Sequence, residues 1–284
     1  MPSSEQIRAG QRAAWARLSA GWEKWDAVIM DQLGPVGTAM IERLDIAADQ
    51  QHLDIASGTG EPGLSIARLA PHGRVVLTDL SAEMLEVAAR RAAAQGIGNI
   101  ETKVCSADDL PFADATFDSV SVRFGYMFFP DMAQATAEFA RVLKPGGRLA
   151  ASVWVSPDQN PWTTIAMDAI ATETELPPPV PGAPTMYRCA APGSITALYE
   201  QAGLHDIAEW NVPLELVTDS PDQYWAMISE HVSLAVAALQ KLDADTQARI
   251  RTHAITNVAA FEQNGKVRIP GLARCVVGTK PNSQ

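Results

Sequence analysis

The sequence lacks an excess of basic residues, a long apolar run and a basic leader. Its 284 residues carry 22 Lys and Arg against 33 Asp and Glu, for a formal net charge of -11. Because positive charge drives binding to nucleic acids and to anionic membranes, we expect neither as a partner. No uncharged apolar run reaches the roughly 18–20 residues that cross a bilayer, and the first residues do not resemble a signal peptide. We therefore expect a soluble, cytoplasmic protein.

Cysteines are few and poorly placed for pairing or metal binding. Cys105, Cys189 and Cys275 lie far apart, and an odd number cannot all pair within one chain. No CxxC pair or Cys/His cluster has the spacing of zinc ligands. The sequence therefore predicts free thiols in a reducing compartment and no metal site.

What the sequence does contain is a regular alternation of strands and helices in its first half. We predict strands at 51–56, 74–79, 100–105, 117–122 and 148–155, helices at 61–70, 81–95 and 132–142, and a turn at 144–147. Such alternation is typical of a parallel sheet flanked by helices.

The first 50 residues read as helices, the second of them (27–46) broken at Gly34-Pro35. Trp15, Leu18, Trp22 and Trp25 recur at spacings of three and four, which places them on one helix face. This stripe indicates either core packing or a lid over a ligand pocket.

The second half predicts helices at 160–176, 193–203, 221–242 and 244–263, strands at 206–217 and 266–280, and a rigid proline-rich loop at 177–181. Length alone would permit two domains. Because the closing strand returns at the end of the chain, we predict one domain instead. It comprises a helical lid (1–50), a cofactor-binding core (51–155), and cap insertions with the last two strands (156–284).

The most informative segment is a glycine-rich turn, Gly58-x-Gly60-x-x-Gly63. It follows a strand and opens a helix, and Asp79 ends the next strand 19 positions after Gly60. Glycines let a ligand approach the backbone, and a carboxylate can accept hydrogen bonds from both hydroxyls of a ribose. Taken alone, the pattern fits a nicotinamide dinucleotide as well as other nucleotides.

The surrounding motifs resemble those of class I S-adenosylmethionine-dependent methyltransferases. Asp54 stands four positions before Gly58, and three further ordered motifs follow at 76–85, 106–118 and 141–149. The segment 122–131 is most similar to the subgroup of ubiquinone/menaquinone C-methyltransferases. This resemblance covers about residues 53–155. It implies a Rossmann-like, seven-stranded sheet with an antiparallel last strand.

The resemblance also implies S-adenosylmethionine as the cofactor. Asp79 would bind the ribose hydroxyls, and Ser106 would accept a hydrogen bond from the adenine amino group. Arg123 would lie near the methionine end, or would instead turn outward or bind a substrate anion. Ala56 stands where many members have glycine, and Ser106 where many have aspartate. The implied cofactor-binding residues are Asp54, Ala56, Ser57, Gly58, Thr59, Gly60, Asp79, Leu80, Met84, Ser106, Ala107, Asp108 and Arg123.

The acceptor is less well defined by the sequence. The Asn/Asp-Pro-Pro-Tyr tetrapeptide of amino-group methyltransferases is missing, and an apolar run, 124–129, occupies its place. Such a wall suits a small hydrophobic acceptor. The candidate acceptor contacts are Trp22, Phe124, Tyr126, Phe128 and Tyr187.

His231 and Tyr126 are the candidate catalytic bases, with Tyr187 a third; His231 could equally be a packed histidine with no catalytic role. We predict methyl transfer to a small, largely hydrophobic acceptor at carbon or oxygen. An NAD(P)-dependent oxidoreductase and a non-catalytic S-adenosylmethionine-binding module are the alternatives. The sequence leaves the identity of the acceptor and the oligomeric state open.

Overall fold

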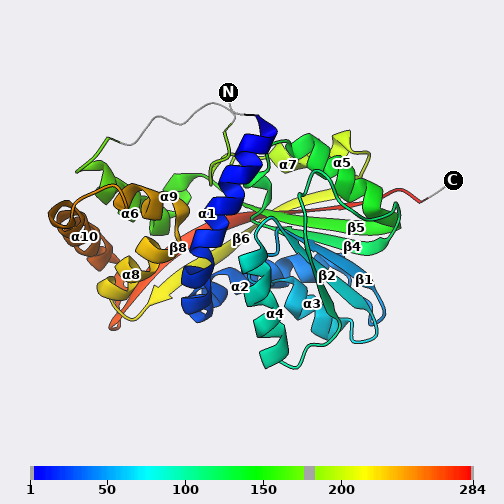
Figure 1. Ribbon diagram of the computed structural model, residues 1–284, viewed down its shortest axis with the longest axis horizontal. Helices are drawn as coiled ribbons and strands as arrows, with labels where there is room; N and C mark the ends of the chain where they lie inside the picture. Colours follow the sequence, from blue (N-terminus) through cyan, green and yellow to red (C-terminus); the bar gives the residue numbers. More distant parts are fainter. Residues whose placement is uncertain (1–2, 176–182, 283–284) are drawn as a thin grey trace.

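A mixed eight-stranded sheet forms the centre of the protein in the computed structural model, which describes residues 3–175 and 183–282 (Figure 1). The strands run in the order β3-β2-β1-β4-β5-β8-β6, and short β7 pairs with β8 alone. Strands β1 to β5 are parallel, whereas β8 is antiparallel to both β5 and β6. The predicted Rossmann-like arrangement with an antiparallel last strand is thus confirmed, with two-residue β7 as an addition. The strands are β1 (Gln51–Ile55), β2 (Arg74–Asp79), β3 (Ile100–Val104), β4 (Phe117–Arg123), β5 (Leu143–Trp154), β6 (His205–Thr218), β7 (Glu262–Gln263) and β8 (Lys266–Thr279).

Helices cover both faces of the sheet and build a cap beyond one end of it. In Figure 1, α5 and α7 lie on one side of the sheet, α3 and α4 on the other, and α6, α8, α9 and α10 gather around the extended ends of β6 and β8. None of the described helices is long and apolar enough to cross a membrane. The helices are α1 (Ser4–Lys24), α2 (Asp26–Leu44), α3 (Gly63–Leu69), α4 (Ala82–Ala94), α5 (Met132–Val142), α6 (Pro161–Ala171), α7 (Ser194–Gln201), α8 (Pro221–His231), α9 (Ser233–Leu239) and α10 (Ala244–Val258).

Helices bury the central strands on both sides, so their inward side chains are apolar or, like His52 and Asp54, hydrogen-bonded to buried serines. Leu53, Val76 and Val120, on β1, β2 and β4, have no exposed surface. Ser81 caps α4 as its sequence suggests, since its hydroxyl accepts a hydrogen bond from the backbone N–H of Met84. The predicted proline-rich loop at 177–181 lies outside the described residues.

Helix α2 runs without interruption through Pro35, so the predicted break at Gly34-Pro35 is wrong. A proline inside a helix costs about 3 kcal/mol because it removes a hydrogen bond. Burial of one face of α2, including Leu33, Val36 and Met40, offsets that cost.

Other boundaries also differ from those predicted. The single helix expected at 221–242 is divided into α8 and α9 at Val232, whose backbone is extended (φ -86°, ψ 109°). Strand β5 already begins at Leu143, so the turn predicted at 144–147 is part of the strand, although Gly146 has a positive φ of 76°. The first difference places His231 at the end of a helix rather than within one.

Candidate active site

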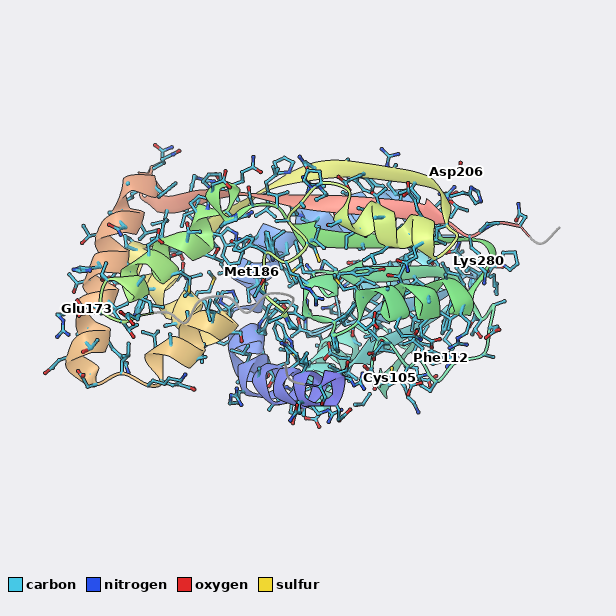
Figure 2. All side chains as sticks on the ribbon, turned by 90° about the horizontal axis from the view of Figure 1, so that it is seen from above. Cys105, Phe112, Glu173, Met186, Asp206 and Lys280 are labelled. Carbon is cyan, nitrogen blue, oxygen red and sulfur yellow. The ribbon has the colours of Figure 1, made fainter. Side chains whose placement is uncertain are left out.

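A cavity of about 580 Å³ opens at the carboxyl ends of the parallel strands. Residues at or just beyond the ends of β1 to β5 line it, and α1, α2, α6, α8 and α9 contribute its remaining walls. Figure 2 labels two of its lining residues, Cys105 beyond β3 and Met186, which lies between the cap helices and the sheet. Carboxyl ends of strands are where open α/β sheets bind their ligands.

Hydrogen bonds to the buried side chain of Asp54 stabilise the glycine-rich turn after β1. Its carboxylate accepts one hydrogen bond from the backbone N–H of Gly63 at 3.0 Å and another from the Ser121 hydroxyl at 2.5 Å. Asp54 is fully buried and does not line the cavity, and this burial raises its pKa to about 7. A Cβ at Gly63 would lie 2.2 Å from Cδ2 of Leu77 and 2.9 Å from a carboxylate oxygen of Asp54, so a larger residue would have to displace both side chains. Asp54 therefore orders the turn, and its implied role at the cofactor stays a prediction.

The backbone is strained where this turn meets the cavity. Ala56 has φ 51° and Phe124, beyond the neighbouring strand β4, has φ 57°. Left-handed conformations are unfavourable for residues with a Cβ. Ala56 therefore takes a conformation natural to the glycine of many family members, and both strained residues line the cavity.

Asp79 presents a carboxylate to the same part of the cavity. One oxygen accepts from the backbone N–H of Gly58 at 3.0 Å and the other from that of Ser81 at 2.9 Å. Each oxygen keeps lone-pair capacity for a further hydrogen bond. Burial raises the pKa of Asp79, whereas its backbone hydrogen bonds lower it. This carboxylate can accept hydrogen bonds from a ribose, and Leu80 and Met84 beside it line the space in which the attached base would lie.

The loop after β3 lines the cavity with Ser106, Ala107 and Asp108. The Ser106 hydroxyl donates to Asp108, so the serine oxygen is free to accept a hydrogen bond from an adenine amino group. Arg8, on α1, donates to the other oxygen of Asp108 at 2.7 Å. Helix α1 is thereby fastened to the loop, as a lid would be.

Arg123 lines the cavity at the end of β4 and is not turned outward. Its Nε donates to the backbone carbonyl of Glu61 at 3.0 Å, and its guanidinium lies 3.9 Å from the sulfur of Met30. Among the described residues, no carboxylate lies within 4.0 Å of it. Burial lowers its pKa, opposed by nearby Glu61 and Asp54. This cation can meet an anionic group of a ligand.

The other half of the cavity is an aromatic chamber. Phe124 stacks on Trp154, with ring centroids 4.2 Å apart and planes 14° from parallel. Trp15 packs edge-on against Phe128 at 5.2 Å, and Trp22 against His231 at 5.8 Å. We call the part of the cavity bounded by Trp15, Trp22, Phe124, Phe128, Trp154, Trp162, Thr163, Met167, Tyr187 and His231 the acceptor chamber. Its flat apolar walls suit a planar ring.

His231 enters the chamber from the end of α8. Its Nδ1 lies 2.7 Å from the backbone carbonyl of Met227, and because a carbonyl can only accept, Nδ1 carries the proton. Nε2 is then a free base, with no hydrogen-bond partner among residues 3–175 and 183–282. Burial lowers the pKa of His231 to about 4, so the ring is neutral at physiological pH.

Tyr126, by contrast, lies outside the cavity. It has no exposed surface, its hydroxyl is 3.1 Å from that of Thr136, and it packs against Phe129 and Phe139. Burial raises its pKa, which makes the phenol a poorer acid and keeps it protonated. The roles predicted for Tyr126 as a base and as an acceptor contact are therefore wrong. The other predicted acceptor contacts, Trp22, Phe124, Phe128 and Tyr187, all line the chamber.

Sequence reasoning missed Gln32, on the buried face of α2. Gln32 is 2% exposed, lines the cavity, and its Nε2 has no hydrogen-bond partner in the described part of the chain. An unsatisfied buried amide costs about 1–3 kcal/mol. The available signal was a polar residue between Ile29, Leu33 and Val36 on an otherwise apolar helix face. Trp154 and Trp162, which the sequence suggested were packing residues, also line the cavity.

Comparison with known proteins finds a matching family model and several similar sequences and structures. Residues 18–172 match the sequence model of the ubiE/COQ5 methyltransferase family. The chain is 42% identical over 130 residues to a ubiquinone/menaquinone biosynthesis C-methyltransferase, UbiE, of Hahella chejuensis, an alignment covering 45% of this chain and 52% of the relative. It is 42% identical over 104 residues to a demethylmenaquinone methyltransferase of Thermus thermophilus, covering 36% and 46% of the two chains. The chain thus spans about half the length of these relatives.

Solved structures share the fold. The YcgJ protein of Bacillus subtilis superposes with a TM-score of 0.57 at 24% identity, covering 87% of this chain and 98% of its own. A phosphoethanolamine N-methyltransferase of Haemonchus contortus, solved with S-adenosylhomocysteine, gives a TM-score of 0.58 at 16% identity and covers 99% of this chain and 61% of its own. At such identities the likeness establishes the architecture alone.

Proposed function

Since this chain belongs to the ubiE/COQ5 methyltransferase family, we propose that it transfers a methyl group from S-adenosylmethionine to a small, planar, hydroxyl-bearing acceptor. The observation that supports this proposal is a single cavity in which one half, lined by Asp79 and Ser106, continues into an aromatic chamber. Donor and acceptor can therefore meet in one space.

Each half of the cavity has residues suited to this task. S-adenosylmethionine, when bound, supplies a methyl group already activated by its sulfonium. The turn from Ala56 to Gly60 would hold its amino-acid end, Asp79 its ribose and Ser106 its adenine. The chain then needs mainly to align the two molecules, which can be worth about 7–11 kcal/mol in favourable cases.

His231 is the residue that we propose as the general base. Its Nε2 lone pair faces no protein donor among the described residues, and it borders the chamber in which the acceptor would lie. Removal of a proton from the acceptor hydroxyl would make the oxygen, or a ring carbon conjugated with it, a better nucleophile. A positioned base contributes typically 10²–10⁴-fold.

The names of the relatives support a quinone-type ring system as the acceptor class. The flat stacked pair Phe124–Trp154 is compatible with such a ring. The comparisons give no support to an NAD(P)-dependent oxidoreductase. A non-catalytic cofactor-binding protein remains the competing outcome of the test.

Ligand binding and turnover together test the proposal. S-adenosylhomocysteine at 100 times its Kd should stabilise the protein by about 2.7 kcal/mol, whereas NAD and NADP should not. With methyl-labelled cofactor, label should pass into an aromatic alcohol from a compound library, and His231→Gln should lower that rate at least 100-fold. Stabilisation by NAD or NADP instead would refute the proposal. Cofactor binding without product across the library would favour the non-catalytic alternative.

A further inference from the structure

Besides His231, the acceptor chamber contains the hydroxyl of Tyr187, whose hydrogen is donated to another residue of the protein. Tyr187 lines the chamber, and its hydroxyl contacts the hydroxyl of Thr163 on α6. The Thr163 hydroxyl is also 3.2 Å from the backbone carbonyl of Asn160, which can only accept. Both contacts are satisfied at once in one arrangement only: Thr163 donates to Asn160, and Tyr187 donates to Thr163. The Tyr187 oxygen is then left with lone pairs alone for a ligand.

His231, like Tyr187, can only accept a hydrogen bond from a ligand, although for a different reason. Its proton is on Nδ1, bound to the carbonyl of Met227, so Nε2 offers only a lone pair. The chamber therefore presents two fixed hydrogen-bond acceptors from different elements, one at the end of α8 and one in the segment before α7. Thr164, Thr185 and Ser233 also line the cavity, but their hydroxyls can rotate to donate or accept and so do not discriminate. The indole Nε1 of Trp22 and the amide Nε2 of Gln32 are donors, but both atoms are buried within the protein rather than presented to the cavity.

We propose that Thr163, by taking the hydrogen of Tyr187, makes the chamber select molecules that donate a hydrogen bond, such as phenols, over the corresponding ethers. This rests on the proposed function only in treating the chamber as the methyl-acceptor site. A phenol can donate to Tyr187 or to His231. An aryl ether brings a lone pair against a lone pair and leaves buried acceptors without partners, which costs affinity. Thr163 is a specificity-determining residue that acts through Tyr187.

The same polarity bears on the product of an oxygen methylation. Conversion of the hydroxyl to a methyl ether removes the hydrogen that these acceptors recognise. The product would then bind more weakly than the substrate at the same position, which favours its release. A product methylated at carbon would keep its hydroxyl and this contact.

Calorimetry with two small probes tests the proposal without turnover. The protein saturated with S-adenosylhomocysteine is titrated with 2-naphthol and with 2-methoxynaphthalene, which share one ring system. We expect 2-naphthol to bind about tenfold more tightly, the effect of about one hydrogen bond. Equal Kd values for the two probes would overturn the proposal.

Variants of the hydrogen-bonded pair separate this role from a structural one. Thr163→Val keeps the shape but frees the Tyr187 hydrogen to donate, so 2-methoxynaphthalene should bind more tightly and the ratio of Kd values should fall to about threefold. Thr163→Ser should retain the wild-type ratio. Tyr187→Phe should lower the ratio mainly by weakening the binding of 2-naphthol, which loses the oxygen to which it donates. A wild-type ratio in folded Thr163→Val would refute the role of Thr163.

The result also distinguishes failure of this inference from failure of the proposed function. If S-adenosylhomocysteine does not bind, the proposed function fails and the selectivity proposal fails with it. If S-adenosylhomocysteine binds and labelled product forms while both probes bind equally, only the selectivity proposal is wrong.

Discussion

Asp79→Asn is the substitution that tests the cofactor site most directly. The wild-type carboxylate accepts from the backbone N–H groups of Gly58 and Ser81 and, in the proposed complex, from two ribose hydroxyls. Asparagine has nearly the same shape but one oxygen, so its amide N–H group must face a donor. Hydrogen bonds to charged groups contribute about 1.5–3 kcal/mol each. We expect the affinity for S-adenosylhomocysteine to fall by about 2–4 kcal/mol, or about 30- to 1,000-fold.

Isothermal titration calorimetry measures this loss, and a thermal melt shows that the variant is folded. Glu86→Gln is a suitable control because it makes the same change of carboxylate to amide on the exposed face of α4, outside the cavity. It should leave the affinity unchanged. Wild-type affinity in folded Asp79→Asn would show that the ribose does not bind at Asp79 and would refute the placement of the cofactor.

Three further predictions follow from local geometry. Ala56→Gly should raise the free energy of unfolding by about 0.5–1 kcal/mol in a urea titration, because relief of the left-handed strain at φ 51° exceeds the entropic cost of glycine; a less stable variant would contradict this. Arg8→Gln should speed release of S-adenosylhomocysteine about threefold or more in stopped-flow experiments, since it removes the 2.7 Å ion pair that fastens α1 to Asp108, and an unchanged rate would show that α1 does not retain the cofactor. Burial lowers the pKa of His231 from 6.5 to about 4, so its folded state resists protonation, and the stability it contributes above pH 6.5 should be lost as the pH falls from 6.5 towards 4. His231→Gln should therefore lose less stability over that range than the wild type, and equal pH slopes would contradict the assignment.

The sheet and the glycine-rich turn could be predicted from the sequence because local signals agree there. Strand β2 was predicted with its observed bounds, Arg74–Asp79, since an apolar run ends at a polar residue. The glycines of the turn reflect a backbone that takes positive φ at Gly58 and Gly60. Both signals depend on neighbours in the chain, which a sequence displays directly.

The acceptor chamber depends instead on contacts between distant segments. Tyr126 and Phe128 are two residues apart in a short 3₁₀ turn, yet one side chain enters the core and the other the chamber. No local pattern distinguishes them, because their directions depend on distant residues. Tyr126 packs against Phe139 and Tyr199, whereas Phe128 packs against Trp15. The continuity of α2 through Pro35 has the same origin, since packing against the sheet outweighs the local preference of proline.

The strained residues lie where the two halves of the cavity meet. Ala56 and Phe124 follow the neighbouring strands β1 and β4, and a Cβ at Gly125 would lie only 2.8 Å from that of Ala56. The two turns are therefore packed too closely to relax separately. One turn would hold the methionine end of the cofactor, and the other carries Phe124, stacked on Trp154 in the acceptor chamber. Methyl transfer requires the donor and the acceptor to lie in line. We infer that the strained backbone at Ala56 and Phe124 is retained, despite its cost in stability, because it helps to align the two molecules.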